Sequence, residues 1–543
     1  MTKKSKIDHY TDKEALDFHN KGKSGKIEII SSKSLTTKRD LSLAYSPGVA
    51  VPVKEISKNP DAAYEYTSKG NLVAVISNGS AILGLGNLGA LASKPVMEGK
   101  AVLFKRFADI DAIDIEIDNT NSEEIIKCIQ NIGNSFGGIN LEDIAAPDCF
   151  IIERKLRETL DIPIFHDDQH GTAIITSAAL INALDISNKK SGDVKVVING
   201  AGASALACAN LFKSIGIKTQ NIIMLDRKGV IYKGRDNVDQ FKSAYAIETK
   251  LRTLKEAMVG ADVFLGLSAK DVLTQDMVKS MAKNPIIFAC ANPDPEIKPE
   301  LVDEVRTDAI VATGRSDYPN QVNNLIGFPY IFRGALDVRA KEINEEMKIA
   351  AAKAIATLAR EQVPDEVVNA YGGDRPHYGK DYIIPSTFDP RLISRIPAAV
   401  ADAAMKSGVA RKKISDIETY KDQLANRLDP SMSIMQGINA QIKKNPKTVV
   451  FAEGEDKNML KAAIAFKNSR LGTPILIGNE KRVKEQLKEI GLDDDFKIKI
   501  VNSTDKEKRE LYTKKLYSKL QRQGLLERDV DRLIRNDRII WGS

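Results

Sequence analysis

The chain has 543 residues, of which 43% are hydrophobic and 28% charged, and its formal net charge is +7. These values are ordinary for a globular protein of about three or four domains, and so mild a charge does not favour nucleic acid as a partner. The charged N-terminus lacks the apolar segment of a signal peptide, and no run reaches the ~18 apolar residues of a membrane span. The four cysteines form no C-x-x-C pair, so we expect a cytoplasmic protein without a membrane partner.

Residues from about 65 to 175 mix apolar runs such as NLVAVISNGS and KAVLFKRFADIDAIDIEI with Gly-rich turns. This predicts strands and turns, followed by a helix near Ser122–Ile132. From Val194 onward, the strand-like runs KVVING, NIIMLD, DVFLGLS, PIIFACANP and AIVATG alternate with helical stretches. Such alternation predicts an α/β fold with a doubly wound parallel sheet covered on both faces. Further helices are expected in EINEEMKIAAAKAIATLAREQ and SRIPAAVADAAMKSG.

The segment KVVINGAGASALACANLF places a G-x-G-x-x-A motif between a strand and a helix. The first glycine permits a tight turn, the second lets the backbone approach a pyrophosphate, and the small last residue lets helix and strand pack closely. The helix N-terminus also offers free N–H groups to the phosphates. We expect a dinucleotide site formed by Gly200, Gly202, Ala203, Ser204 and Ala205.

The choice between NAD and NADP stays open at this point. Asp226 ends the second strand of this region, where an acid would bind a ribose 2′-hydroxyl and favour NAD. Arg227 and Lys228 follow directly and could instead neutralise the 2′-phosphate of NADP.

Two short segments, GGINLEDIAAP and IPIFHDDQHGTA, concentrate acidic residues after apolar runs. They contain Glu142 and Asp143, and Asp167 and Asp168. Carboxylates gathered at strand ends suit Mg²⁺ or Mn²⁺, which prefer oxygen ligands. The alternative is that these acids cap helices or pair with lysines.

Several longer motifs resemble those of the malic enzyme family and follow the family order over about the first 420 residues. They are AYSPGVA (44–50), ILGLGNLG (82–89), KPVMEGK (94–100), INLEDI (139–144), FHDDQHGTA (165–173), NGAGASA (199–205), ANPDPEI (291–297) and GRSDYPNQVNN (314–324). The resemblance is to the bacterial type in which a phosphotransacetylase-like domain follows the malic enzyme portion. KTVVFAEGED looks like the start of that domain.

The resemblance implies oxidative decarboxylation of L-malate to pyruvate and CO2. It assigns the general base to Lys100, the acid that protonates C3 to Tyr45, and the tuning of Lys100 to Asp167. A lysine base works near neutral pH only if its pKa is lowered, and we expect burial or nearby cations to do this. The metal ligands implied by the motifs are Glu142, Asp143 and Asp168.

The resemblance also assigns substrate contacts to the amides of Asn292 and Asn323. Larger malic enzymes carry a malate-binding arginine just before ILGLG, whereas this chain has Ser80 and Ala81 there. The shorter bacterial type also lacks the arginine, so the carboxylate must be held by another residue. Arg315 is a candidate for the missing carboxylate clamp. We expect a homodimer or a higher homo-oligomer.

Three domains are predicted: an N-terminal substrate domain (1–160), a Rossmann-type NAD(P)-binding domain (161–428) and a partial α/β phosphotransacetylase-like domain (429–543). The last is too short to include the parts that would bind acetyl-CoA and phosphate, so we expect a truncated domain without transferase activity.

The runner-up function is a malate or 2-hydroxy acid dehydrogenase that stops at the keto acid. Such an enzyme typically uses a His–Asp pair and an arginine clamp without metal, which the acid cluster and the lysine–tyrosine pair argue against. A non-catalytic dinucleotide or acetyl-CoA sensor is a further alternative, although a sensor does not need the proton-transfer pair.

Overall fold

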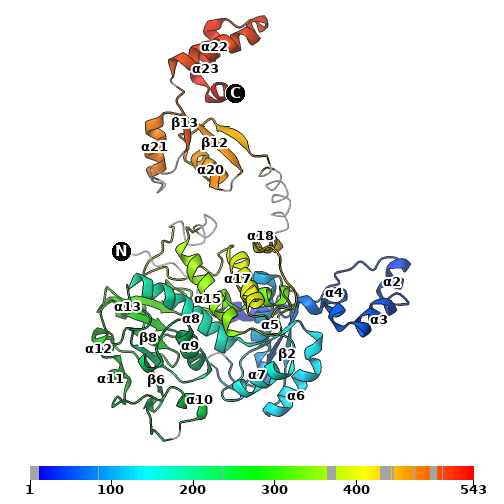
Figure 1. The fold of residues 1–543 in the computed structure, drawn as a ribbon, viewed down its shortest axis with the longest axis vertical. Coiled ribbons are helices and arrows are strands. Elements are labelled where there is room, and N and C mark those ends of the chain that lie inside the picture. Colours follow the sequence, from blue (N-terminus) through cyan, green and yellow to red (C-terminus); the bar gives the residue numbers. More distant parts are fainter. Residues whose placement is uncertain are drawn as a thin grey trace. The chain divides into compact units, whose positions relative to one another are not determined.

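The computed structural model describes residues 11–82, 85–236, 238–363, 368, 375–428, 442, 445–468, 471–489, 498–503 and 505–543. It divides the chain into two compact units, Met1–Leu428 and Asp429–Ser543. Within the described residues, the first unit contains a four-stranded and a six-stranded sheet, and the second contains a three-stranded sheet (Figure 1).

The four-stranded sheet is parallel throughout, with the strand order β2-β1-β3-β4. Its strands are β1 (Leu72–Ser77), β2 (Asp111–Glu116), β3 (Gly138–Leu141) and β4 (Ile164–His166). Its helices are α5 (Ala90–Ala108), α6 (Ser122–Ile132) and α7 (Asp148–Thr159). Val73 and Val75 belong to the same core as α5, whereas the alternate residues Ala74 and Ile76 share a core with α6 and α7. Both faces are therefore covered, as the period-2 geometry of a strand requires.

The six-stranded sheet has the order β10-β9-β8-β5-β6-β7, with only β7 antiparallel. Its strands are β5 (Val196–Asn199), β6 (Ile222–Asp226), β7 (Gly229–Val230), β8 (Val263–Gly266), β9 (Ile286–Ala289) and β10 (Ile310–Thr313). The helices of this region are α9 (Ala203–Ser214), α10 (Gln240–Ser243), α11 (Leu254–Met258), α12 (Gln275–Ser280) and α13 (Pro299–Asp303). The strand order reverses between β5 and β8, which is where doubly wound sheets bind their ligands. The α/β class predicted from the sequence is confirmed.

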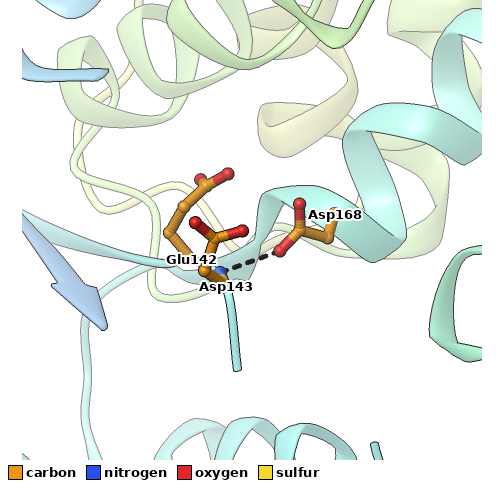
Figure 2. Close-up of side chains that lie close together, drawn as sticks. All are labelled: Glu142, Asp143 and Asp168. Atoms are coloured by element: carbon orange, nitrogen blue, oxygen red, sulfur yellow. Dashed lines mark hydrogen bonds between the residues drawn. The ribbon is translucent and has the colours of Figure 1, made fainter. Parts of the chain in front are cut away.

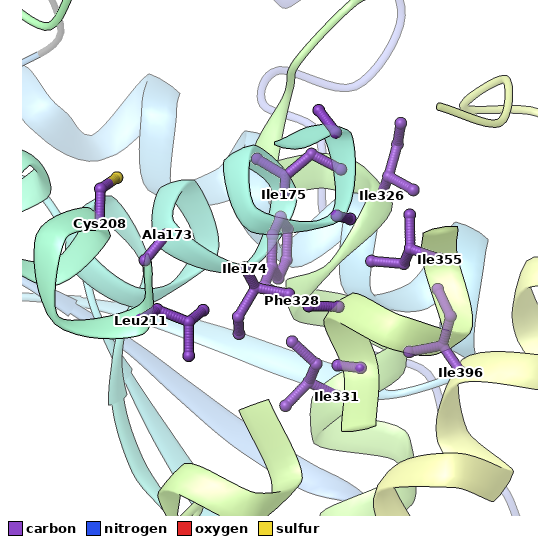
Figure 3. Packing of buried hydrophobic residues seen from close by; sticks show 14 of the residues in the cluster. Ala173, Ile174, Ile175, Cys208, Leu211, Ile326, Phe328, Ile331, Ile355 and Ile396 are labelled. Carbon is purple, nitrogen blue, oxygen red and sulfur yellow. The ribbon is translucent and has the colours of Figure 1, made fainter. Parts of the chain in front are cut away.

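Long helices form the centre of the first unit and bury its largest apolar core. They are α8 (Asp167–Ile186), α14 (Phe328–Asp337), α15 (Glu345–Arg360), α17 (Leu392–Lys406) and α18 (Ile417–Arg427). Figure 3 shows Ile174 of α8 among Leu211 of α9, Phe328 of α14 and Ile355 of α15. The buried core of α8 fixes the helix whose first turn carries Asp167 and Asp168.

The N-terminal arm differs from the rest of this unit because its helices bury no side chains. It contains α2 (Lys38–Ala44), α3 (Ala50–Lys58) and α4 (Ala63–Tyr66), none of which buries a residue. Ahead of it lies α1 (Asp12–Asn20), also without buried residues. The arm is held at its C-terminal end, where Arg411 donates a 2.7 Å hydrogen bond to the Tyr64 hydroxyl. Figure 1 shows α2 and α3 at the edge of the unit, away from both sheets.

The second unit is a parallel sheet of order β11-β12-β13 with α-helices between and after its strands. Its elements are β11 (Lys447–Phe451), α20 (Lys457–Asn468), β12 (Gly472–Ile477), α21 (Glu480–Glu489), β13 (Lys499–Val501), α22 (Lys506–Leu520), α23 (Glu527–Asn536) and α24 (Arg538–Gly542). Across the described residues of both units, every helix is too short or too polar to serve as a membrane span.

One expected strand is wrong. The run KAVLFKRFA lies in helix α5, and only the following DAIDIE forms a strand. Its buried residues Met97, Ala101, Phe104 and Ala108 are three or four apart, the spacing of one helix face. A continuous apolar run does not by itself distinguish a strand from a buried helix. The predicted helix Ser122–Ile132 is confirmed.

Candidate active site

Three carboxylates meet at the carboxyl edge of the four-stranded sheet. Glu142 and Asp143 directly follow β3, and Asp168 lies in the first turn of α8, directly after β4 (Figure 2). The two strands are parallel neighbours in register, with Leu141 opposite His166, so the residues that follow them emerge at the same edge. One oxygen from each of the three carboxylates lies within 4.8 Å of the others.

The backbone of Asp143 helps to hold the cluster. It adopts a left-handed conformation with φ 53°, which aspartate and asparagine tolerate better than most residues. Its N–H donates to Asp168 Oδ2 at 2.9 Å, and its carbonyl accepts a hydrogen bond from the Ala81 N–H at 2.9 Å. The turn therefore links β3 both to α8 and to the loop after β1.

Ionising the carboxylates of this cluster is energetically unfavourable unless a positive charge balances them. Burial, reinforced by the charge of Asp168, raises the pKa of Asp143 to about 7. Burial raises the pKa of Glu142 well above its ordinary value, with further increases from the neighbouring acids. Asp143 Oδ2 is buried without a hydrogen-bond partner among the described residues. A hard divalent cation fits this arrangement because it would supply positive charge and accept the unpaired oxygen as a ligand.

Lys100 lies beside the carboxylates on the buried face of α5. Its Nζ is 2.5 Å from Asp167 Oδ2 and 3.0 Å from Glu142 Oε1, and it lies 4.5 Å from the centre of the Phe328 ring. Burial lowers the pKa of Lys100, but the charges of Asp167 and Glu142 outweigh it and raise the pKa above the ordinary lysine value. The expectation that burial or nearby cations lower this pKa is therefore wrong for the metal-free site, because the immediate neighbours are acids.

Two residues that the sequence analysis did not single out hold these groups in place. Asn324 Nδ2 donates to Asp167 Oδ2 at 2.6 Å, and Asn140 Nδ2 donates to Glu142 Oε2 at 2.9 Å. Asn140 is fully buried inside β3, and the sequence offered a signal for it, since an amide within an apolar strand-like run is unusual. Asn324 has no such signal, because it is adjacent to the equally polar Asn323.

The glycine motif forms the turn between β5 and α9. Gly200 has φ 126°, and a Cβ there would lie 2.5 Å from the main-chain oxygen of Leu267. A Cβ on Gly202 would meet nothing within 4 Å, so open space lies in front of the turn. Gly202 caps α9 without any side-chain hydrogen bond, which leaves the first N–H groups of the helix available to an anion. These features fit a dinucleotide pyrophosphate.

The start of α9 is bonded to the carboxylate cluster. Ser204, in the first turn of α9, donates from Oγ to the main-chain oxygen of Asp168 at 2.8 Å. Ala203 precedes it in the same turn, and Ala205 is buried against the core. The structure therefore brings the expected dinucleotide motif and the expected metal ligands together.

Asp226 lies at the end of β6, as expected, but its carboxylate already has partners. Oδ1 accepts the Lys228 N–H at 2.8 Å, and Oδ2 accepts a hydrogen bond from Arg235. Arg227 and Lys228 are exposed. The sequence suggested that this carboxylate could bind a ribose hydroxyl, but it gave no sign that Arg235 already forms a hydrogen bond with it.

The other expected substrate residues have the following contacts. Asn292 is exposed at the end of β9, and its amide lies next to Gly314. Asn323 Oδ1 accepts the Leu325 N–H at 2.9 Å and so caps a short 3₁₀ turn. Arg315 makes two hydrogen bonds with Asp317, at 2.7 and 2.6 Å. To bind the malate carboxylate, the Arg315 guanidinium would have to do so while it is also bonded to Asp317.

Tyr45 is not brought to the carboxylates within one chain. It is the C-cap of α2, in the N-terminal arm, and the residue is 72% exposed. Among the described residues its hydroxyl makes no hydrogen bond with Lys100 or with the acids around it. The AYSPGVA motif alone gives no indication of this position.

Three family models match the chain: the malic enzyme N-terminal domain over residues 24–127, the malic enzyme NAD binding domain over 169–369, and phosphate acetyl/butaryl transferase over 433–543. An NADP-dependent malic enzyme of Rhizobium meliloti is 62% identical over 97% of this chain and 70% of its own length. A NAD-dependent malic enzyme of the same organism is 49% identical over 98% of this chain. The crystal structure of the Pyrococcus horikoshii malic enzyme aligns with a TM-score of 0.71 at 43% identity, covering 79% of this chain and 98% of that one.

Proposed function

The chain belongs to the malic enzyme family, as its motifs predict, and we propose that it converts L-malate to pyruvate and CO2 with reduction of NADP⁺. The observation that carries this proposal is the contact of Lys100 with the carboxylate cluster, next to a helix N-terminus open to a dinucleotide. A dehydrogenase that stops at the keto acid has no need of such a cluster.

Glu142, Asp143 and Asp168 are proposed to hold Mg²⁺ or Mn²⁺, which when bound supplies Lewis acidity for oxidation and decarboxylation. Lys100 is proposed to take the proton of the C2 hydroxyl, which requires that a bound cation offset the acids that now hold the lysine's own proton. Asp167, held by Asn324, positions Lys100 and keeps its Nζ directed at the cluster. Asn292 and Asn323 are proposed to contact malate, and Arg315 is proposed as its carboxylate clamp.

NADP⁺ is proposed to bind at Gly200, Gly202, Ala203, Ser204 and Ala205, where it would supply the acceptor for the C2 hydride. The exposed cations Arg227 and Lys228 support NADP⁺ over NAD⁺, although a relative named as NAD-dependent shows that the family includes both. We assign residues 1–160 to the substrate domain, 161–428 to the cofactor domain and 429–543 to a phosphotransacetylase-like domain, in a cytoplasmic protein.

A second copy of the chain is proposed to complete the site. In this proposal Tyr45 protonates C3 after CO2 leaves, yet it lies on an exposed arm. The same region exposes an unusual set of apolar side chains, namely Ile29, Ile30, Leu35, Leu41, Leu43, Val49, Val51 and Val53. So many exposed apolar side chains in one segment support its burial in a protein–protein interface. A symmetric dimer would bury it and present Tyr45 to the partner's cluster.

The activity test is a spectrophotometric assay with L-malate, Mn²⁺ and either NADP⁺ or NAD⁺, with pyruvate and CO2 measured in the products. Reduced cofactor accompanied by CO2, and loss of turnover with EDTA, are expected. Oxaloacetate without CO2, or full turnover by Lys100→Ala, would contradict the proposal.

The shared site is tested by mixing two inactive variants, Lys100→Ala and Tyr45→Phe, under conditions that let subunits exchange. Random pairing makes half of the dimers mixed, and each mixed dimer has one intact site, so about a quarter of the parent activity should return. If each site uses its own chain's tyrosine, mixing restores nothing.

A further inference from the structure

A short hairpin closes the edge of the six-stranded sheet beside the dinucleotide motif. Asp226 ends β6 and pairs with Gly229 at the start of β7, which leaves Arg227 and Lys228 exposed at the tip. In doubly wound sheets, the residues at the end of this second strand face the adenosine ribose. The hairpin therefore carries three charged side chains at the position where NAD⁺ and NADP⁺ differ.

Arg235 fastens the base of this hairpin. Its NH1 donates to the carbonyl oxygens of Gly229 and Val230, both at 3.0 Å, and its NH2 donates to Asp226. Only 7% of its side chain is exposed. Burial by itself would raise the pKa of Asp226, but the hydrogen bonds from Arg235 and from the Lys228 N–H lower it. Asp226 is thus an ionised carboxylate that is already paired.

The pairing changes what the ribose end of the site prefers. An unpaired Asp226 would accept the ribose hydroxyls of NAD⁺ and repel the doubly charged 2′-phosphate of NADP⁺. With Arg235 in place, the charge of Asp226 is neutralised and Arg227 and Lys228 remain as two exposed cations at the tip. The hairpin as a whole then favours an added phosphate.

We propose that Arg235 determines the cofactor preference, by occupying Asp226 so that the ribose site accepts a 2′-phosphate. This rests on the proposed use of NADP⁺ and names the residue responsible for it. Arg235 acts through Asp226 and is a positioning residue. Its nine-residue separation from Asp226 in the sequence conceals this role.

The test measures equilibrium binding of NADP⁺ and of NAD⁺ by titration calorimetry, without malate or metal. Arg235→Met should lower the ratio of NADP⁺ to NAD⁺ affinity by about tenfold or more. The variant Asp226→Asn removes the carboxylate that Arg235 masks. The double variant lacks both members of the pair, so the shift should disappear and its ratio should return close to that of the parent.

Arg306→Met is the matched control. Arg306 also pairs with an aspartate, through Nε and NH2 to Asp308 at 2.7 and 2.8 Å, and also donates to a main-chain carbonyl of the same domain. This variant should lose a similar amount of thermal stability and leave the affinity ratio unchanged. If Arg235→Met does not fold, Arg235→Lys takes its place. Lysine keeps the positive charge but lacks the forked guanidinium that makes these hydrogen bonds, so the affinity ratio should shift in the same direction.

Three results would overturn the proposal: a parent that binds NAD⁺ more tightly than NADP⁺, a folded Arg235 variant that weakens both cofactors equally, or a double variant that keeps the shift. The malate assay of the parent is read separately. A parent without malate turnover defeats the proposed function, whereas the binding ratios still decide the role of Arg235.

Discussion

The burial of Asp143, reinforced by the charge of Asp168, predicts that Asp143→Asn stabilises the metal-free protein. Asparagine has the same shape and also tolerates φ 53°, so the backbone turn should persist. The pKa of Asp143 is about 7 in the fold against an ordinary value of 3.8, which corresponds to a cost on the order of 2–4 kcal/mol when the group is ionised. For a unit as large as Met1–Leu428, ~1 kcal/mol corresponds to ~1 °C, so the melting temperature should rise by about 2–4 °C.

The pH dependence has a definite sign. The unfolded carboxyl loses its proton above about pH 4, whereas folded Asp143 keeps it until about pH 7. The cost in the parent is therefore absent below pH 4, grows between these values and is complete above pH 7. The gain from Asp143→Asn should be full at pH 8 and fall to roughly a third at pH 5.

Scanning calorimetry in EDTA at pH 5 and pH 8 measures this gain. Asp271→Asn is the control, because Asp271 also has a left-handed backbone (φ 59°) but is exposed and lies outside the cluster. Adding Mn²⁺ at ~100 times its Kd should stabilise the parent by about 3 kcal/mol and the variant by less. A variant that melts at or below the parent at pH 8, or whose gain is the same at both pH values, would refute the reasoning.

Three further substitutions have defined outcomes. Gly171→Ala would place a Cβ 1.9 Å from Asp167 Oδ1, so kcat should fall about 100-fold with an unchanged circular dichroism spectrum; a normal kcat would show that Asp167 does not position the base. Asn182→Ala removes the two hydrogen bonds that its buried amide donates to the main-chain oxygens of Ala356 and Ile383 and should cost about 2–4 kcal/mol in urea unfolding; a cost near zero would contradict this. Gly200→Ala should lose both stability and NADP⁺ binding, whereas Gly202→Ala, whose Cβ meets no protein atom, should lose only binding; equal melting temperatures for the two would be inconsistent with the turn geometry.

The sheets were the most predictable part of the molecule. Apolar β-branched runs that alternate with helices indicate a parallel sheet because both of its faces must be covered. The acids at the ends of β3 and β4 could be grouped for the same reason, since parallel neighbours end at one edge. The run KAVLFKRFA was expected to be a strand, although it lies in helix α5, because a short apolar run fits a buried helix as well as a strand.

Contacts that depend on tertiary structure could not be predicted. Nothing in the sequence separates Asn324, which holds Asp167, from Asn323, which caps a turn. The pKa of Lys100 depends on which side chains surround it, and the motif alone did not indicate that these are acids. Tyr45 matches its motif, yet its exposure follows from the path of the arm.

The hydrogen bond from Ser204 to the main-chain oxygen of Asp168 has a consequence for how the metal and dinucleotide sites influence each other. Asp168 follows β4, the parallel neighbour of β3, so all three carboxylates emerge at one sheet edge, and the bond joins the start of α9 to that edge. A cation that draws the carboxylates together would therefore also act on the helix N-terminus where the dinucleotide is proposed to bind. Occupancy of the two sites is then coupled, and the coupling is the same in both directions.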